Sequence, residues 1–575
     1  PPRSTLFPST TLFRSVNDNE TLLTALRRNG FKIPTLCDMK GFTPTGACRL
    51  CAVEMEGKRE LVTSCSYPVQ QGMVIYTNSV RVIKARKALV EMLLSNHPDD
   101  CLYCERNGNC ELQWLAEEMN VKERNYFGEK NTYTRDHSSL SVFRDPAKCI
   151  LCSRCIRVCE EVQLVSAIDL NARGNKTTIN PAFNKGLNIS SCINCGQCII
   201  VCPTGALVDI SHIEKTITNI INPSVLGVAL ISSQFVVSVS EHYNLRPTDD
   251  PFGLIVSALK MLGFEKVHDM GWSSDLNVIL EARELLTRLK NKNTTPLISS
   301  CCPSWVKYAE EFNSKLLADI STVKSPQQLM GNIAKSYYSE NQNSKVKRTF
   351  TVSFSACVAN KYEASREENT NKGISEIDAV ITVREFLRML RSYGIDLTML
   401  TSENSAKPFD QSSVSGYQTS YSGGKTEAVA NQLNYMLNNK NTGSFRLNIP
   451  KNPISKKEAR VTLGKHEIGF AWVSGINEAQ KYLTELKKEN RNDINYIEIM
   501  ACTGGCANGG GQPISRNPEK PKIRKKVCQE LERVKDLTVA GENKSVDAFL
   551  TGHLSTNLEN TSPLYTKFDQ KDKKI

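Results

Sequence analysis

The chain has 575 residues, which is more than a single hydrophobic core supports and predicts three or more domains. Apolar residues make up 40% and charged residues 23%, the balance of a folded globular protein and not of a disordered chain. No run of about 18 apolar residues is present, so the sequence predicts no transmembrane helix. The net charge of +12 comes without a nucleic-acid-binding motif, and we interpret it as a solvated basic surface or as a docking face for an acidic electron carrier.

The 21 cysteines are the unusual feature of the composition. Most of them are separated by two or three residues in a long chain, which favours metal ligation over a disulfide scaffold. Residues 1–15 are treated separately, because they lack an initiator Met and contain two near-identical elements, S-T-L-F and S-T-T-L-F, which is typical of a cloning or sequencing artefact. We exclude them from the fold and expect the native N-terminus, with any targeting peptide, to be missing.

The first cysteine group consists of Cys37, Cys48, Cys51 and Cys65. Cys48 and Cys51 lie on a loop with Gly and Thr residues, whose backbone N–H groups can donate hydrogen bonds to the sulfurs of a cluster. Cys65 follows an expected hairpin that turns at residues 56–58. Plant-type ferredoxins place the ligands of a 2Fe–2S cluster in the same C…C-x2-C…C order. The group therefore predicts a 2Fe–2S cluster.

The second group consists of His97, Cys101, Cys104 and Cys110. A lone histidine is usually a structural residue, but this one precedes three cysteines at a short distance, and a 4Fe–4S cluster needs a fourth donor. Imidazole is a good iron ligand and, being neutral, shifts the potential of a cluster relative to four thiolates. We therefore predict a His-ligated 4Fe–4S cluster.

Two four-cysteine runs follow, both with the spacing C-x2-C-x2-C-x3-C. This is the pattern of bacterial two-cluster ferredoxins, in which the fourth cysteine of each run binds the cluster of the other run. The pattern assigns one 4Fe–4S cluster to Cys149, Cys152, Cys155 and Cys202. It assigns a second to Cys159, Cys192, Cys195 and Cys198. Four clusters in succession predict a path for electrons.

Beyond residue 214, apolar runs typical of strands alternate with amphipathic helical stretches, which is the pattern of an α/β domain. The expected strands include Phe350–Phe354, Ala379–Thr382, Ile468–Val473 and Ile494–Met500. The expected helices are Leu276–Lys290, Val306–Phe312, Arg384–Ser392 and Glu478–Lys488. The polar stretch Glu403–Thr419 is expected to be a loop.

Three further cysteine motifs each follow an expected strand. They read SSCCPSW at 299–305, FSACVANKYEA at 354–364 and EIMACTGGCANGGGQP at 498–513. Because sites in α/β folds form at the carboxyl ends of the strands, we expect the motifs to converge at that edge of a sheet. They contain Cys301, Cys302, Cys357, Cys502 and Cys506, which leaves only Cys528 without a group.

These motifs resemble the catalytic domain of [FeFe]-hydrogenases, and the resemblance runs from about residue 17 to near the C-terminus. The domain order is similar to that of the large, clostridial and hydrogenosomal type with four accessory clusters. The resemblance implies a multidomain α+β protein. Its expected parts are a β-grasp 2Fe–2S ferredoxin domain (16–82), a small His-ligated 4Fe–4S domain (83–143), a two-cluster ferredoxin domain (144–214) and an α/β catalytic domain (215–575).

By this resemblance, Cys302, Cys357, Cys502 and Cys506 hold a 4Fe–4S cluster, and Cys506 bridges it to a di-iron unit with CO, CN⁻ and a dithiolate bridge. This H-cluster and the four accessory clusters make up the implied cofactors. Glycines in the last motif allow the backbone to approach an inorganic cluster closely. The residues implied to line the H-cluster are Met500, Gln327, Gly504 and Gly505.

The proton path of the family implies further roles. Cys301, next to Cys302, matches the thiol that exchanges protons with the di-iron site, and a thiol suits this role because its pKa responds to its environment. Glu281 and Glu284 are three residues apart on an expected helix and share a face, and Ser321 matches the serine of the path. Without the resemblance, the two glutamates would be interpreted as a solvated helix face.

The chain departs from the family pattern beside the expected cofactor. Asn360 stands where related enzymes have a Lys that bonds a cyanide ligand, and Ser355-Ala356 stands where they have Met-Pro. Ser232-Ser233 stands at an Ala-Pro segment. The expected iron ligands and proton relay are intact, so these changes bear on catalytic rate and direction and not on architecture.

Three functional hypotheses follow. The first is a ferredoxin hydrogenase that reversibly reduces protons to H₂. The second is a weakened paralogue that acts in electron transfer or H₂ sensing. The third is a subunit like that of respiratory complex I, which would leave the C-terminal cysteines without a role. The implied partners are ferredoxin or a similar carrier, hydrogenase maturation proteins and NADH-oxidising flavoprotein subunits, in an anaerobic compartment that is either cytoplasmic or hydrogenosomal.

Overall fold

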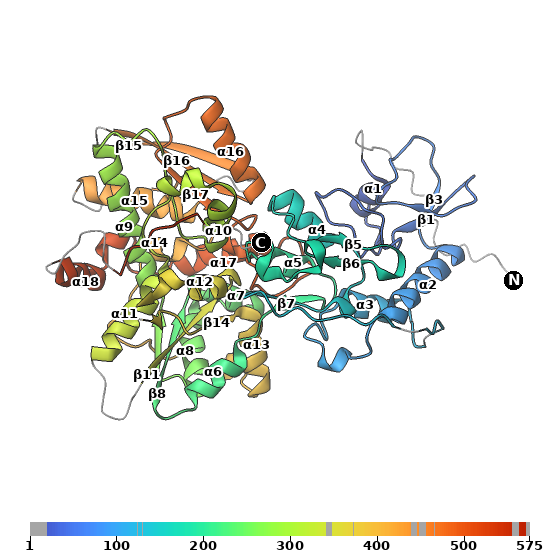
Figure 1. The fold of residues 1–575 in the computed structure, drawn as a ribbon, viewed down its shortest axis with the longest axis horizontal. Helices are drawn as coiled ribbons and strands as arrows, with labels where there is room; N and C mark the ends of the chain where they lie inside the picture. The colour runs from blue at the N-terminus through green and yellow to red at the C-terminus, as the bar shows by residue number, and fades with distance from the viewer. Residues whose placement is uncertain are drawn as a thin grey trace.

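The computed structural model describes residues 20–123, 125–128, 130–340, 348–371, 373–438, 445–447, 456–464, 466–554 and 563–570. Residues 1–15, which we interpret as an artefact, lie outside this set. In Figure 1 the N-terminal elements lie at the right and a larger C-terminal body lies at the left. The short helices α4 (Arg154–Arg157) and α5 (Gln197–Val201) lie between them, so the three parts follow one another in space in the same order as along the chain.

The N-terminal part is built on a small antiparallel sheet in the order β2-β1-β3. The expected hairpin is present, because Gly57 takes a positive φ of 77° and the Lys58 N–H donates to the Met55 carbonyl at 3.1 Å. Buried leucines of the first helix pack against the sheet. The elements are α1 (Leu22–Arg28), β1 (Ala52–Met55), β2 (Val62–Thr63), β3 (Ile75–Tyr76), α2 (Val80–Asn96) and α3 (Glu111–Glu118).

The segment with the two four-cysteine runs shows its internal duplication in the backbone. α4 and α5 each begin after a residue in the left-handed region, Ser153 with φ of 60° and Gly196 with φ of 69°. Each helix carries the third cysteine of its run. The antiparallel strand pairs here are β4 (Val142–Arg144) with β7 (Leu207–Asp209) and β5 (Asp169–Asn171) with β6 (Thr178–Asn180).

The C-terminal part contains two four-stranded sheets. The first is parallel, in the order β14 (Ala379–Thr382), β11 (Arg348–Ser355), β8 (Val225–Ile231), β9 (Lys266–Asp269). The second has the order β10 (Leu297–Ile298), β17 (Tyr496–Met500), β16 (His466–Ser474), β15 (Lys456–Leu463), and only its last pair is antiparallel. The strands are rich in buried β-branched and aromatic residues, as parallel sheets covered on both faces require.

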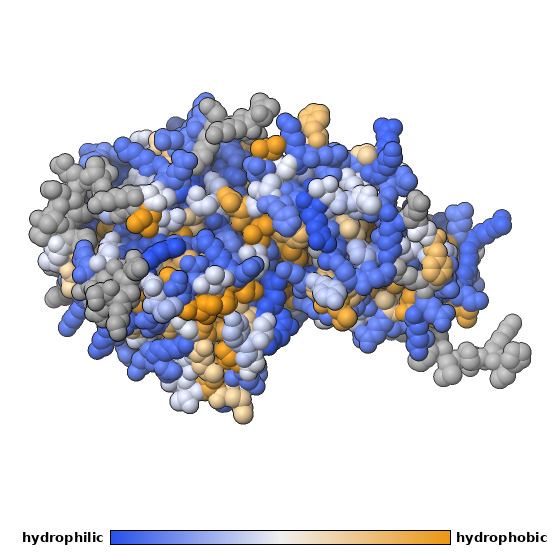
Figure 2. Space-filling view, turned by 60° about the horizontal axis from the view of Figure 1, so that its bottom comes forward, coloured by the Kyte–Doolittle hydropathy of each residue, from blue (hydrophilic) through white to orange (hydrophobic). Residues whose placement is uncertain are grey.

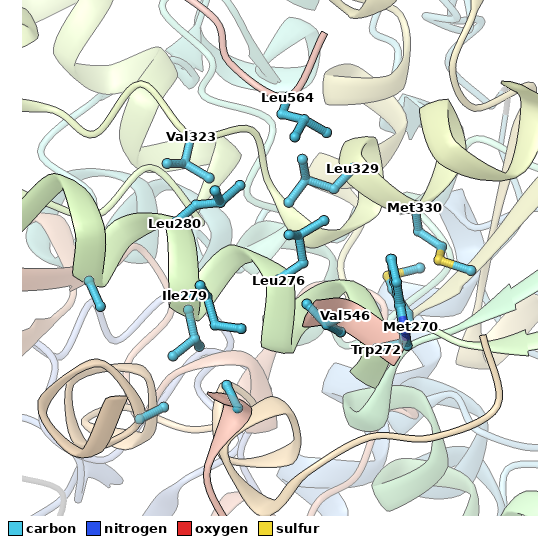
Figure 3. Packing of buried hydrophobic residues seen from close by; sticks show 14 of the residues in the cluster. Met270, Trp272, Leu276, Ile279, Leu280, Val323, Leu329, Met330, Val546 and Leu564 are labelled. Carbon is cyan, nitrogen blue, oxygen red and sulfur yellow. The ribbon is translucent and has the colours of Figure 1, made fainter. Parts of the chain in front are cut away.

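One core joins the two sheets. It contains residues of both sheets and of α9 (Gly271–Lys290), α11 (Pro326–Glu340) and α15 (Gly424–Asn438). Figure 3 shows Leu276 and Leu280 of α9 turned toward Val323 and Leu329. α9 is therefore fixed in the centre of this part, and its remaining face is available for polar side chains.

Other helices cover the outer faces of the two sheets. The first sheet packs against α7 (Ser233–Tyr243), α8 (Pro251–Met261) and α13 (Val383–Ser392), and the second against α10 (Pro303–Phe312) and α16 (Ile476–Lys488). The remaining elements of this part are α6 (Ile213–Ile220), α12 (Ala359–Ala364), β12 (Thr370–Asn371), β13 (Ile374–Ser375), α14 (Val414–Gln418), α17 (Lys520–Glu532) and α18 (Lys544–Leu554).

The expected strands and helices of the C-terminal part are confirmed, with ends that differ by a few residues. The prediction of a loop over 403–419 is wrong at its end, where α14 forms. Its small residues are needed for packing, since a Cβ on Gly416 would lie 2.5 Å from the carbonyl oxygen of Gly271 on α9. The Ser and Gly content that indicated a loop thus reflects a helix packed closely on another helix.

None of the described helices is long and apolar enough to cross a lipid bilayer, as the sequence predicts. Figure 2 shows a face that is mostly hydrophilic, with hydrophobic residues gathered in small groups.

We predict that Leu280→Ala destabilises the protein by about 2–5 kcal/mol, because the side chain is 1% exposed in the shared core and its removal leaves a cavity. Denaturant unfolding measures the change. Lys290→Ala, at the exposed end of the same helix, is the control and should change the free energy of unfolding by less than about 0.5 kcal/mol. Equal effects of the two substitutions would contradict the assigned core.

Candidate metal centres and active site

The four cysteines of the first group are buried beside β1. Their thiols contact one another in two pairs, Cys37 with Cys48 and Cys51 with Cys65. The Leu36 N–H donates to Cys48 Sγ at 3.4 Å. The structure therefore brings together all four predicted ligands of the 2Fe–2S cluster, on the loops that the spacing indicates.

The second group lies at the C-terminal end of α2 and along the segment that leads to α3. His97 is buried and follows the last residue of α2, whereas Cys101 is exposed. The group is in contact with the next one, since Cys110 Sγ donates to the carbonyl oxygen of Pro203 at 3.6 Å. A Cβ on Gly205 would lie 2.6 Å from Cys104 Sγ, so glycine is required for this close approach.

Two largely apolar cavities lie in the duplicated segment. One is lined by Cys149, Cys152, Cys155 and Cys202. The other is lined by Cys159, Cys192, Cys195 and Cys198. The structure thus groups the eight cysteines in the crossed arrangement that the sequence predicts, with the fourth cysteine of each run in the cavity of the other.

Backbone N–H groups point at the sulfurs in several of these groups. They donate to the Sγ atoms of Cys48, Cys149, Cys159, Cys192 and Cys302, each at 3.4 Å. Such bonds stabilise negative charge on thiolate sulfur and are a common feature of iron–sulfur sites. None of the 21 cysteines, all of which lie among the described residues, forms a disulfide.

The three C-terminal motifs meet at one place, but they come from two sheets and not from one. Cys301 and Cys302 follow β10, and Cys502 follows β17, its neighbour in the second sheet. Cys357 follows β11 of the first sheet. The prediction of a single sheet edge is therefore wrong, because the pattern of one strand does not determine which sheet the strand joins.

Burial raises the pKa of all four predicted thiol ligands here. The pKa of Cys357 is raised to about 12, and the pKa values of Cys502 and Cys506 are raised well above the usual value for a thiol. The Ala501 N–H donates to Cys302 Sγ, and Gln197 Nε2 donates to Cys502 Sγ at 3.1 Å. Thiols that are buried together in this way become thiolates when a metal supplies the compensating charge.

Among the described residues, no three His, Cys, Asp or Glu side chains are arranged around a point as the ligands of a single ion would be. In an iron–sulfur cluster each thiolate binds a different iron, so the ligands of a cluster do not surround one point. The donor set, with four buried thiols per group and N–H donors to sulfur, is chemically suited to iron–sulfur clusters.

Glycines shape the loop that carries Cys502 and Cys506. Gly504 and Gly505 both have φ of 84°, a conformation that other residues rarely adopt. A Cβ on Gly505 would lie 2.9 Å from the sulfur of Met500, so these two residues lie against each other as the resemblance implies. A Cβ on Gly510 would lie 2.5 Å from the carbonyl oxygen of Cys195 in the duplicated segment. The loop is thus packed between two cysteine groups.

The predicted proton-relay residues form two contacting pairs. Cys301 Sγ lies 3.7 Å from Glu281 Oε1, and burial raises the pKa of this thiol to about 12. Ser321 Oγ donates to Glu284 Oε2 at 2.7 Å, and burial raises the pKa of Glu284. The alternative interpretation of the two glutamates as a solvated face is wrong for Glu281, which is fully buried.

Sequence reasoning missed the residues that surround Glu281. Ser299 Oγ and the Tyr496 hydroxyl donate to its two carboxylate oxygens at 3.0 and 2.7 Å. Lys425 Nζ lies 3.6 Å from Glu281 Oε2. These residues come from three separate elements, and no spacing pattern in the sequence links them to α9.

The structure also places the residues that depart from the family pattern. Asn360 Nδ2 donates to Ser355 Oγ at 3.0 Å, so the two substitutions contact each other. The next residue, Lys361, is fully buried and pairs with Glu385 at 2.7 Å, which leaves it unable to replace the missing Lys at 360. Gln327 Nε2 donates to the Asn360 carbonyl at 3.2 Å.

Buried polar atoms without a hydrogen-bond partner among the described residues accompany these positions. They include Gln327 Oε1 and both amide atoms of Gln234. Ser232 and Ser233, just before Gln234, are satisfied by contacts to Phe354 and Ser420. Buried amides are normally paired, so these atoms are available to a bound polar group or to water. Gln234 had no signal in the sequence.

Four known families match successive parts of the chain. Residues 14–80 match a 2Fe-2S iron-sulfur cluster binding domain, and residues 86–125 match the NADH-ubiquinone oxidoreductase-G iron-sulfur binding region. Residues 148–206 match a 4Fe-4S dicluster domain. Residues 226–510 match the C-terminal domain of the iron-only hydrogenase large subunit.

Two relatives match nearly the whole chain. The NADP-reducing hydrogenase subunit HndD of Solidesulfovibrio fructosivorans is 34% identical over 541 residues, 92% of each chain. The chain belongs to the iron-only hydrogenase family. Iron hydrogenase 1 of Clostridium pasteurianum is 32% identical over 515 residues, 89% of each chain. The predicted family and the mixed α+β fold with 2Fe–2S, 4Fe–4S and hydrogenase domains are confirmed.

Two further similarities cover only part of this chain. The apo form of an [FeFe]-hydrogenase of Chlamydomonas reinhardtii superposes with a TM-score of 0.55 at 22% identity, over 63% of this chain and 99% of the other. The cytosolic Fe-S cluster assembly factor narfl of Xenopus tropicalis is 33% identical over 303 residues, 50% of this chain and 62% of that protein. Membership of the family therefore supports a hydrogenase-type oxidoreductase without fixing its electron carrier.

We predict that Glu363→Gln flattens the pH dependence of stability. Glu363 accepts from Gln327 Nε2 at 3.0 Å, and burial raises its pKa from 4.5 to about 7. Between these values the folded state holds a proton that the unfolded state has lost, so stability falls as pH rises, by up to about 3 kcal/mol. Denaturant unfolding between pH 5.5 and 8 measures this. The same slope in wild type and variant would show that Glu363 ionises normally.

Proposed function

We propose that this chain catalyses the reversible reduction of protons to H₂ with electrons from reduced ferredoxin or a similar carrier. The observation that carries the proposal is the contact of Cys301 with Glu281, at 3.7 Å, next to a predicted iron ligand. A protein that only transfers electrons or assembles clusters needs no buried thiol and carboxylate beside its terminal cluster. A hydrogenase needs such groups to bring protons to a site that is closed to water.

We assign the metal ligands from the grouping of the thiols. Cys302, Cys357, Cys502 and Cys506 would hold the H-cluster, and retention of its di-iron unit would depend on Cys506. When bound, the H-cluster would supply the redox chemistry that interconverts protons and H₂. The accessory ligands are the 2Fe–2S set Cys37, Cys48, Cys51 and Cys65, the 4Fe–4S set His97, Cys101, Cys104 and Cys110, and the two sets that line the cavities of the duplicated segment.

The residues around the site have two roles in the proposed mechanism: some line the cofactor and others transfer protons. Met500, Gln327, Gly504 and Gly505 line the cofactor, and the positive φ of the two glycines lets the backbone turn closely around it. The Cys301 thiol holds a proton because burial disfavours its thiolate. Beyond it, Glu281 exchanges that proton, and Ser321 with Glu284 continues the path along α9.

Contacts between the cysteine groups support an electron path. Gln197, between Cys195 and Cys198, donates both to Cys502 Sγ and to the Asn508 carbonyl. On the other side, Arg157 of α4 donates to the carbonyl oxygen of Cys37. Cys101 of the His-ligated group is exposed, so electrons can also enter from the surface through this group. We propose ferredoxin, maturation proteins and NADH-oxidising flavoprotein subunits as partners, in a cytoplasmic or hydrogenosomal compartment.

A weakened paralogue that transfers electrons or senses H₂ is the second candidate. It is favoured by Asn360, whose amide is directed to Ser355 while Lys361 is held by Glu385. A hydrogen-evolution assay of the maturated protein with a reduced dye separates the two candidates. Turnover supports the hydrogenase, and intact clusters without turnover support the paralogue.

We predict that Cys301→Ser abolishes most turnover and keeps the iron content, because it removes a proton carrier and no iron ligand. Cys506→Ser, its matched control, should lose the di-iron unit. Iron analysis and hydrogen evolution measure the two effects. A loss of iron in Cys301→Ser as large as that in Cys506→Ser would contradict the assigned roles.

We predict that Asn360→Lys raises both turnover and retention of the di-iron unit. A Lys at this position would donate a charge-assisted hydrogen bond to a cyanide ligand of the di-iron unit. Such a bond is worth about 1–2 kcal/mol more than one from a neutral donor. If this difference acts on the transition state, turnover rises about 5- to 30-fold. Activity per iron is the measurement, and equal or lower activity of the variant would show that other groups already compensate for Asn360.

A further inference from the structure

Lys425 is a charged side chain enclosed in the protein. It is the second residue of α15, and its side chain is 1% exposed. Its ammonium group hydrogen-bonds Asn277 Oδ1 and lies 3.6 Å from Glu281 Oε2. Both of those side chains are fully buried on α9. A buried ammonium is costly unless it is paired, so this lysine is held in place by its two acceptors.

Hydrogen bonds and close packing hold the start of α15 in place, and this fixes the position of Lys425. Glu498 of β17 accepts hydrogen bonds from the backbone N–H groups of Gly423 and Thr426, each at 2.8 Å. A Cβ on Gly424 would lie 1.8 Å from the carbonyl oxygen of Gln418, which makes glycine necessary there. The backbone on both sides of Lys425 is therefore anchored to the strand that leads to Cys502.

Asn277 connects Lys425 to the thiol of the relay. Its Oδ1 accepts from Lys425 and also from Cys301 Sγ, the latter at 3.3 Å. Its Nδ2 donates to the carbonyl oxygen of Lys324 at 2.9 Å, which orients the amide with its oxygen toward the thiol. An amide oxygen that accepts from an ammonium is polarised and less free to rotate. Lys425 and the Cys301 thiol therefore share one acceptor, the Asn277 amide oxygen.

Glu281 is the other acceptor that Lys425 and Cys301 share. Among the described residues, the titratable groups that face its carboxylate are Lys425 from α15, Tyr496 from β17, Cys301 from the loop after β10 and Glu284 from α9 itself. Lys425 is the single cation among them. A carboxylate that must alternately accept and release a proton in a closed site depends on such a cation to stabilise its ionised form.

We propose that Lys425 is a positioning residue of the proton relay: through Asn277 and Glu281 it aims the Cys301 thiol and keeps Glu281 available as a proton acceptor. The proposal rests on the proposed hydrogenase function. It adds a cation to a path that is otherwise made of a thiol, carboxylates and hydroxyls.

Lys425→Met, in the maturated enzyme, removes the charge and keeps most of the volume. We expect hydrogen evolution at the optimal pH to fall at least about 10-fold and the acid limb of the pH profile to move upward by about one pH unit, because the ionised relay carboxylate loses its cation. Lys425→Arg should keep the wild-type profile. The matched control is Lys335→Met, which removes another largely buried lysine, paired with Asp378 and Ser375. It should leave the profile unchanged.

A second readout does not depend on activity. With the assigned ligands occupied as thiolates, only Cys301 and Cys528 keep an S–H group, so the infrared S–H stretch of Cys301 is identified by its loss in Cys301→Ser. In Lys425→Met, and in Lys425→Gln if the Met variant does not fold, this band should shift, because the Asn277 amide oxygen that accepts from the thiol loses its charged donor.

An S–H band at the wild-type position, in a variant with wild-type iron content, would overturn the proposal, as would an unchanged pH profile in an active variant. A shifted band in a protein whose wild type evolves no hydrogen would contradict the proposed function and still support the positioning role. The two failures are therefore distinguishable.

Discussion

Four thiols from the ends of two different sheets share one buried space, and burial raises the pKa of each of them. Without a metal this arrangement is unfavourable, because four thiolates would repel one another and four neutral thiols would give little stabilisation. Iron supplies the missing charge. Several other features follow from this requirement: the glycines with positive φ, the N–H donors aimed at sulfur, and the core of α9, α11 and α15 that fixes the two sheets relative to each other.

The N-terminal part and the duplicated segment contain further cysteine groups, which connect the C-terminal site to the protein surface. Each cysteine group touches the next through one or two specific contacts, such as Gln197 with Cys502 and Cys110 with Pro203. In the proposed mechanism electrons and protons would approach the site from different directions, since the cysteine groups lie on the N-terminal side and the proposed relay runs along α9. This separation lets an enclosed site exchange both without admitting bulk water.

Much of this could be predicted from the sequence, because cysteine spacing is a local property. The C-x2-C-x2-C-x3-C runs predict the crossed grouping that the two cavities show, and apolar periodicity predicts strands such as β11 and β17. What could not be predicted depends on contacts between distant elements. The two sheets, the pairing of Lys361 with Glu385 and the convergence of Asn277 and Lys425 on Cys301 have no signature in local spacing.

The central claim is that the four C-terminal thiols hold an H-cluster, and infrared spectroscopy of protein co-expressed with the maturation proteins tests it most directly. Carbon monoxide and cyanide ligands absorb where the polypeptide does not. The account predicts sharp CO and CN⁻ bands in the wild type that disappear in Cys506→Ser. A wild-type protein with its accessory clusters in place and no such bands would contradict it.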